Sequence, residues 1–286
     1  MPGRLAPRAL FLVAVAVGSV QFGAALARTL FDEAGPAGTV LVRVGIAAAV
    51  LALLWRPSVR GHGRDAWRLA VGFGVSLAVM NFFFYEALDR IPLGLAVTFE
   101  FVGPLGVALA GSRRRLDLAW VALAAGGIVL IALPGTSGLD ALGVLYALVA
   151  GGAWAAYILL SARTGRVFPG GGGLALAMCV AAALLVPVGV ADGGSALLDA
   201  DVLLIGAAVA LLSSVIPYSA EFEALRLMPE HVFGVLLSLE PAVAALAGYL
   251  LLDQTLGARE LAGIAFVIAA TAGAVAGTRG PVPRDA

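Results

Sequence analysis

The sequence contains almost no cysteine or histidine and no lysine, and these shortages exclude several kinds of site. A single cysteine, Cys179, cannot form an internal disulfide or a cysteine-based zinc site. Two histidines, His62 and His231, are too few for a histidine metal site. The 18 basic residues, all arginine, balance 18 acidic residues, so net charge gives no support for nucleic-acid binding. We expect no metal, no cofactor and no nucleic-acid partner.

Motifs of ATP-driven pumps and membrane enzymes are also missing. No P-loop is present, which argues against ATP coupling within this chain, and there is no HExxH motif and no paired aspartate cluster. We therefore expect no enzymatic activity, and a membrane-embedded enzyme is a poor alternative.

Charged residues make up only 13% of the chain, whereas 61% of residues are hydrophobic and the mean hydropathy is +1.01. A soluble domain of 286 residues could not cover so much apolar surface with so few charges. The sequence therefore predicts an all-α, polytopic protein whose surroundings are a lipid bilayer.

Glycine and proline breakers divide the chain into apolar runs of about twenty residues, the length that crosses a bilayer as a helix. The first run is expected to be a retained helix and not a cleaved signal peptide, because similar runs follow it. Ten transmembrane helices are predicted near residues 9–30, 36–55, 66–88, 93–110, 116–133, 140–161, 171–191, 202–220, 231–252 and 258–277.

The distribution of arginine predicts the orientation of these helices. Most arginines fall in segments on the side of the N-terminus, and only Arg28, Arg90 and Arg259 fall in segments on the other side. Because arginine-rich loops remain in the cytoplasm, both termini are expected to be cytoplasmic. Abundant Ala and Gly with no lysine suggest a GC-rich bacterial genome, so the expected location is the bacterial cytoplasmic (inner) membrane.

An internal repeat relates the two halves of the chain. At one constant offset Pro92 aligns with Pro229, Pro104 with Pro241, and Glu86-Ala87-Leu88 with Glu223-Ala224-Leu225. Chance similarity between apolar helices is the alternative. The predicted units are a first five-helix repeat over 1–134, a second over 135–279, and a short tail over 280–286.

An odd number of helices in each repeat makes the second copy enter the membrane from the opposite side. Inverted repeats are typical of secondary transporters, which bind their substrate near the midplane where the halves meet. The repeat therefore indicates transport by alternating access.

Several motifs in order along the chain resemble the drug/metabolite transporter superfamily of EamA type and, within it, the threonine/homoserine exporter branch. The resemblance implies ten helices in two inverted halves and export of small amino acids or related metabolites. One departure is Glu223, where the branch is expected to have an apolar residue. The motifs are Met80-Asn81, Tyr85 to Gly94, Glu100 to Leu105, Ser112 to Arg114, Gly152 to Tyr157, Pro217 to Ser219 with Glu221, and Phe233 to Pro241.

Two acidic residues, Glu100 and Glu240, are expected deep in the membrane beside proline breaks. An ionised side chain there costs about 2.5–3.5 kcal/mol even on the mildest scale, so a functional role is the default interpretation. Each could face a central cavity and exchange protons or hold a substrate ammonium. The alternative is a structural carboxylate that caps backbone amides around the breaks. Gly103, Pro104 and Pro241 are the predicted hinges.

Arg43 is expected inside the second helix, where it could bind a substrate carboxylate or pair with a deep glutamate. Glu86 and Glu223 are possible gates at opposite mouths, with Arg90 and Arg226 as partners; solvated surface pairs are the alternative. Further polar residues recur at helical spacing and are candidates for substrate binding, with helix packing as the alternative. They are Gln21, Asn81, Tyr85, Trp154, Tyr157, Tyr218 and Glu221.

These observations predict a secondary active exporter of small amino acids (threonine/homoserine-like) or related metabolites, a proton-coupled antiporter working by alternating access. The expected partners are a small-molecule substrate, the bilayer and protons. A broad drug/metabolite exporter, or an importer of the same superfamily, is the alternative.

Overall fold

A computed structural model describes residues 7–58, 61–110, 115–132, 139–168, 170–227, 233 and 236–277. These ranges contain helices and their connections, and no strand. The helices are α1 Pro7–Arg28, α2 Phe31–Trp55, α3 Arg64–Arg90, α4 Leu93–Glu100, α5 Val102–Ala110, α6 Arg115–Ala132, α7 Ala141–Val167, α8 Gly172–Gly193, η1 Gly194–Leu198, α9 Ala200–Ala210, η2 Leu211–Val215, α10 Ile216–Leu227, α12 Glu240–Leu252 and α13 Ala258–Gly277.

The lengths and compositions of these helices are those of a membrane protein. In the described ranges six helical stretches are long and apolar enough to cross a bilayer: Pro7–Arg28, Phe31–Trp55, Arg64–Arg90, Ala141–Val167, Gly172–Leu198 and Ala200–Tyr218. Large apolar side chains such as Leu184, Val186 and Val190 are exposed on the outer surface of α8, where lipid would cover them. The predicted all-helical membrane class is confirmed.

The helix boundaries differ from the predicted spans in informative places. The predicted eighth span continues to Leu227, so Glu221 and Glu223 lie within α10 and not at or beyond a helix end. Leu211–Val215 forms one π-helical turn between α9 and α10. The count of ten spans and the inverted repeat remain predictions. The proposed boundary at 134/135 and the tail 280–286 lie outside the described residues.

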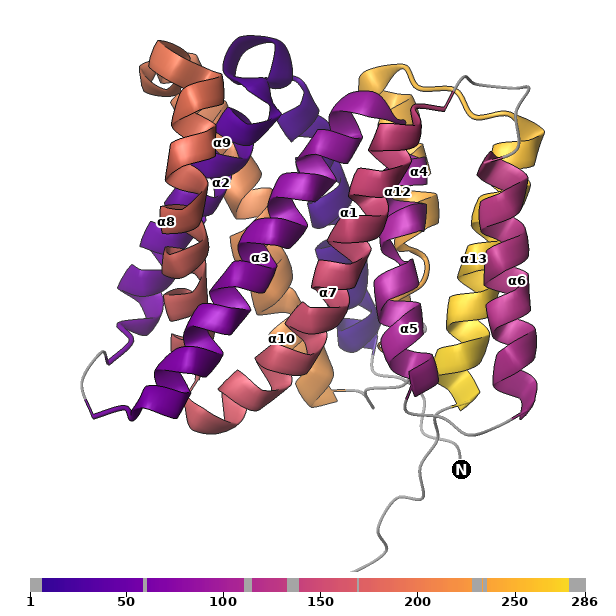
Figure 1. Cartoon of the computed structure of the whole chain (residues 1–286), viewed down its shortest axis with the longest axis horizontal. Helices are drawn as coiled ribbons and strands as arrows, with labels where there is room; N and C mark the ends of the chain where they lie inside the picture. Colours follow the sequence, from indigo (N-terminus) through magenta and orange to yellow (C-terminus); the bar gives the residue numbers. More distant parts are fainter. Residues whose placement is uncertain are drawn as a thin grey trace, which may run out of the picture.

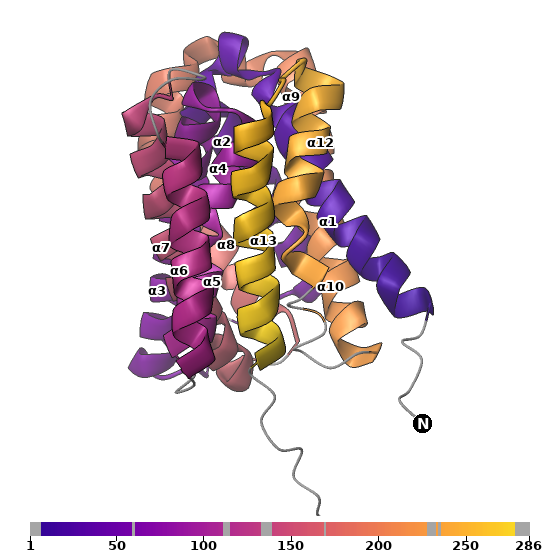
Figure 2. The same ribbon diagram turned by 90° about the vertical axis from the view of Figure 1, so that its right-hand side faces the viewer.

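The helices pack as a bundle in which segments far apart in sequence lie side by side (Figures 1 and 2). α2 packs on α8, α4 on α12, and α6 on α13, the last pair forming one edge of the bundle. α3 packs on α7 and α8, while α1 packs on α10 and α12. A large buried cluster that includes Phe73, Tyr85 and Phe101 fills the space between them.

Two helix breaks lie next to the predicted hinges. α4 ends at Glu100 and α5 begins at Val102, so Pro104 falls in the first turn of α5. α12 begins at Glu240, with Pro241 in its first turn. Proline is tolerated in a first turn because the N–H that it lacks has no partner within the helix there. The chain therefore breaks just before each proline, at Phe101 and at Leu239.

α5 approaches α7 closely at Gly103. A Cβ atom built on Gly103 would overlap the carbonyl oxygen of Gly151, and one built on Gly151 would lie 2.6 Å from the carbonyl oxygen of Glu100. Small residues allow backbones to approach in this way in membrane helices. The two glycines thus fix the break between α4 and α5 against the middle of α7.

We predict that Gly103→Ala destabilises the protein by about 1–3 kcal/mol, because the new methyl group must push α5 away from α7. Gly106→Ala in the same helix is the matched control, since a Cβ there meets nothing within 4 Å. The free energies of unfolding in mixed micelles test this. Equal stability of the two variants would contradict the close contact.

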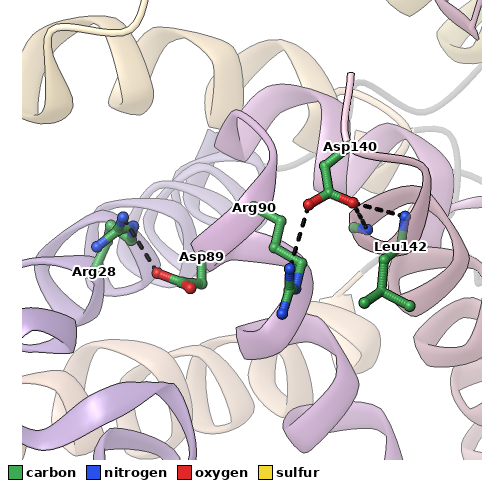
Figure 3. A network of polar contacts seen from close by, with 6 residues as sticks. Arg28, Asp89, Arg90, Asp140 and Leu142 are labelled. Atoms are coloured by element: carbon green, nitrogen blue, oxygen red, sulfur yellow. Dashed lines mark hydrogen bonds and ion pairs between the residues drawn. The ribbon is translucent and has the colours of Figure 1, made fainter. Parts of the chain in front are cut away.

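One end of the bundle, where α1 and α3 end and α7 begins, is fastened by polar contacts (Figure 3). Arg28 lies 3.3 Å from Asp89, and Arg90 lies 3.3 Å from Asp140, which ties α1 to α3 and α3 to α7. At the same end Asp192 of α8 accepts a hydrogen bond of 2.8 Å from the amide of Ala37, next to the kink at Gly35 (φ 65°) in α2. Each half-exposed ion pair contributes little alone.

Asp140 also caps α7. Its carboxylate accepts hydrogen bonds from the amides of Gly143 (3.2 Å) and Leu142 (2.7 Å), as Figure 3 shows for Leu142. These backbone hydrogen bonds, with a smaller contribution from Arg90, lower the pKa of Asp140 from its ordinary value. The ionised carboxylate therefore stabilises the start of α7.

We predict that Asp140→Ala lowers the melting temperature at neutral pH. A depressed pKa in the folded state gives stability that is complete above the ordinary aspartate pKa of about 3.9 and is lost as the carboxylate becomes protonated at lower pH. The difference between variant and wild type should therefore shrink below about pH 4. Asp65→Ala, which removes an exposed aspartate paired with Arg68, is the control. A difference that stays constant with pH would exclude the ionised cap.

Candidate functional site

Arg43 lies near the middle of α2 and is only 7% exposed. Its Nη2 atom donates a hydrogen bond to Oδ1 of Asn81 on α3. Its guanidinium carbon lies 5.1 Å from the ring centroid of Tyr85, which is one turn after Asn81 on the same helix. Asn81 is oriented by donating from Nδ2 to the carbonyl oxygen of Leu77 (2.8 Å). In the described residues no carboxylate lies within ion-pair distance of Arg43, so its neighbours are an amide and an aromatic ring.

Glu240, the first residue of α12, is 7% exposed and reaches towards α1. Nε2 of Gln21 donates a hydrogen bond of 3.2 Å to its carboxylate. Oε1 of the same glutamine is buried and has no hydrogen-bond partner within the described ranges. Gln21 therefore holds Glu240 with one end and leaves an acceptor available at the other.

The remaining acids belong to the same buried region. Glu100, 8% exposed at the end of α4, lies close enough to Arg43 and to Glu240 for their charges to interact. Glu221 of α10 interacts in the same way with Glu240 and with Tyr218. The centre of the bundle thus contains one guanidinium, three carboxyl groups and the amide of Gln21. Each of these five groups comes from a different helix. We call Gln21, Arg43, Glu100, Glu221 and Glu240 the polar centre.

Predicted aromatic residues surround the polar centre. The indole of Trp154 meets the ring of Phe101 edge-on, with centroids 5.0 Å apart, and so packs against the break between α4 and α5. Tyr157, one turn along α7, lies 5.3 Å from the ring of Phe73 and close enough to Glu221 for an electrostatic interaction.

A cavity of about 400 Å³ lies at the end of the bundle where α1 begins, opposite the ion pairs of Figure 3. Tyr157 and Tyr218 line it, so it adjoins the polar centre. The indole of Trp55 packs against Gly170 and Gly171, where a Cβ would overlap it. The lining residues are Leu51, Trp55, Phe73, Tyr157, Ser161, Thr164, Gly165, Gly170, Gly171, Gly173, Leu174 and Tyr218.

Some predicted site residues lie elsewhere. Glu86 is half-buried near the fastened end, and Arg90, its suggested partner, forms its ion pair with Asp140 because α7 begins beside it. The side chains of Glu223 and Arg226, the second suggested gate, lie outside the described part of the structure. Among the described residues no three His, Cys, Asp or Glu side chains form a metal site.

Sequence reasoning missed several parts of this region. Phe73 and Thr164 line the cavity, but in the sequence they resemble ordinary core residues. Trp55, the last residue of α2, also lines the cavity. The π-helical turn places Ser213 against Gly23 of α1, and neither its buried hydroxyl nor that of Ser214 has a hydrogen-bond partner within the described part of the chain. The run of glycines from Gly170 to Gly173 is the feature of the sequence that could have indicated the cavity, because glycines often occur where a side chain or another helix packs closely against the backbone.

Comparison with known proteins gives concordant results. The EamA-like transporter family matches this chain over residues 141–276. The threonine/homoserine exporter RhtA of Escherichia coli (strain K12) is 38% identical over 96% of this chain and 94% of its own length. The protein of the same name from Salmonella typhimurium (strain SL1344) is 37% identical over 92% of this chain and 90% of its own.

A solved crystal structure with 20% sequence identity shares the fold, with a TM-score of 0.65 over 94% of this chain and 96% of that one. Together with the apolar helices, the relatives identify a bacterial inner-membrane protein of exporter type. The chain therefore belongs to the EamA-like transporter family, and it is similar over almost its whole length to the threonine/homoserine exporters.

Proposed function

We propose that this protein exports small amino acids of the threonine/homoserine type by alternating access, in exchange for protons. The observation that carries the proposal is the polar centre, in which Arg43, Glu100 and Glu240 are buried and Glu221 is partly buried, beside a cavity. The names of the relatives supply the substrate class.

A zwitterionic amino acid complements this arrangement. Its carboxylate requires a guanidinium that is free of an ion pair, and Arg43 contacts Asn81 and Tyr85 with no carboxylate within ion-pair distance among the described residues. Its ammonium requires acids and aromatic rings, which Glu221, Tyr157 and Tyr218 provide at the edge of the cavity. We assign the carboxylate to Arg43 and the ammonium to the glutamates.

Alternating access draws support from the packing of the helices. Under the proposed repeat α1 matches α7, α2 matches α8, and α3 matches α9 with α10. α3 packs on α7 and α8, and its counterparts α10 and α9 pack on α1 and α2, so the contacts exchange as an inverted repeat requires. With both termini cytoplasmic, the cavity faces the cytoplasm and the ion pairs close the outer side.

Proton exchange is assigned to Glu240. Its carboxyl group is near two other acids, Glu100 and Glu221, and has one neutral hydrogen-bond donor in Gln21. Three neighbouring carboxylates in a buried site cannot all be ionised at low cost. A change in the distance between them during the cycle would release or take up a proton.

We predict that Arg43→Lys weakens apparent substrate affinity by about ten-fold or more, about 1.4 kcal/mol, because an ammonium cannot reproduce the planar fork. The measurement is the concentration dependence of transport in proteoliposomes. A variant that fails to fold would instead favour a structural role for Arg43. Arg68→Lys, at an exposed ion pair, is the matched control.

The whole proposal is tested with inside-out vesicles that contain the wild-type protein or Glu240→Gln. We expect the wild type to take up labelled threonine and homoserine faster with a pH gradient than without one. Glu240→Gln, which cannot titrate, should lose this dependence on the gradient.

Three results would contradict parts of the proposal. Uptake of a cationic dye but of neither amino acid would favour a broad drug exporter. Uptake that ignores the gradient would exclude proton coupling. Unchanged pH dependence in Glu240→Gln would move the proton to another group.

A further inference from the structure

One residue that lines the cavity has a buried hydroxyl group without a hydrogen-bond partner in the described part of the chain. Thr164 is 1% exposed, it lines the cavity near the end of α7, and its Oγ1 has no hydrogen-bond partner within the described ranges. Buried polar side chains nearly always have a partner, so such an atom requires an explanation.

Other buried threonines of the same chain show what Thr164 does not do. The hydroxyls of Thr39, Thr98 and Thr271 each donate to the carbonyl oxygen four residues earlier in their own helix, at 2.7, 2.6 and 2.9 Å. Threonine in a helix commonly satisfies its hydroxyl in this way. Thr164 also lies within a helix, but its hydroxyl does not form this hydrogen bond to the carbonyl oxygen four residues earlier.

Packing explains why the hydroxyl stays available. A Cβ built on Gly173 would lie 2.5 Å from Cγ2 of Thr164, so the methyl group of Thr164 occupies the space that this glycine leaves empty. Gly173 itself lines the cavity. Ser161, one turn earlier on α7 and also in the lining, donates to the carbonyl oxygen of Ile158 (3.0 Å). Of these two hydroxyls, Thr164 is therefore the one with an uncommitted donor.

The rest of the cavity is lined by both polar and apolar side chains. Tyr157, Ser161 and Thr164 recur on one face of α7, and Tyr157 and Thr164 are about 10 Å apart along its axis. The Tyr157 end adjoins Glu221 and Tyr218, and Phe73 and Leu174 supply apolar walls. Its volume of about 400 Å³ is within the usual range of small-molecule sites.

We propose that this cavity is an entry subsite in which Thr164 binds the side-chain hydroxyl of the substrate. The proposal rests on the function proposed above and identifies a specificity-determining residue for it. Amino acids that carry a side-chain hydroxyl are preferred over equally large ones that do not, because only the former satisfy Oγ1 of Thr164.

Threonine and valine are the appropriate pair of substrates, because they differ by a hydroxyl in place of a methyl group. Homoserine and norvaline form a second such pair. The purified full-length protein is reconstituted into liposomes, and the ratio of transport efficiencies within each pair is measured. We expect the wild type to prefer threonine and homoserine.

Thr164→Val, which keeps the shape and removes the hydroxyl, should lower both ratios about ten-fold while valine transport is maintained. Thr164→Ser, which keeps the hydroxyl, should retain the preference. Thr271→Val is the matched control, because it makes the same change at a buried threonine whose hydroxyl is bonded within α13. Should Thr164→Val fail to fold, Thr164→Ala provides the same comparison without the hydroxyl.

Two outcomes overturn the inference and are distinguishable from each other. If the wild type transports threonine, and Thr164→Val or Thr164→Ala keeps the wild-type ratios, the subsite is wrong and the proposed function stands. If the wild type transports neither threonine nor homoserine, the proposed function is wrong, and the subsite is rejected with it.

Discussion

The guanidinium of Arg43 is the group on which the arrangement of the centre depends. A charge in the interior of a membrane protein must be matched by partners within the protein, since lipid offers none. Asn81 and the face of the Tyr85 ring orient Arg43 without neutralising it. Glu100, on α4, is near enough for its charge to interact with that of Arg43, although the described residues form no ion pair with this guanidinium. Glu240 is near both Glu100 and Glu221, so the centre combines one guanidinium with carboxyl groups that repel each other when ionised.

The two ends of the bundle differ in a way that follows from this centre. At one end ion pairs and capping hydrogen bonds tie neighbouring helices together, although each contact contributes little. At the other end aromatic and glycine residues surround a cavity that reaches the polar centre. Many weak contacts can separate one by one, whereas a buried apolar interface opens only as a whole. The fastened end is therefore suited to repeated opening and closing.

The sequence predicts those features that depend on short stretches of chain. Apolar runs and their Gly or Pro breakers located most helices, and the deep acids were recognisable because they are costly. Tertiary partners were not predictable in the same way. Spacing along α3 suggested that Glu86 pairs with Arg90, but Arg90 contacts Asp140 because α7 begins beside it. The break at Phe101 precedes the predicted one at Gly103-Pro104, because proline fits the first turn of a new helix. The cavity residue Thr164 is recognisable only once its missing partner is seen.

The π-helical turn at Leu211–Val215 determines which face the end of this helix presents to the centre. A π-turn takes more residues into one turn than an α-helix does, and each α-helical residue advances the chain by about 100° around the axis. Tyr218 and Glu221 follow this turn, so the direction in which they face depends on its winding as well as on their own side chains. In a related chain of the same length, with a regular α-helix in place of the π-turn, both residues would be rotated by about 100° around the helix axis. The face that such proteins present to their centre can therefore change through the winding of a single turn, with every side chain still encoded.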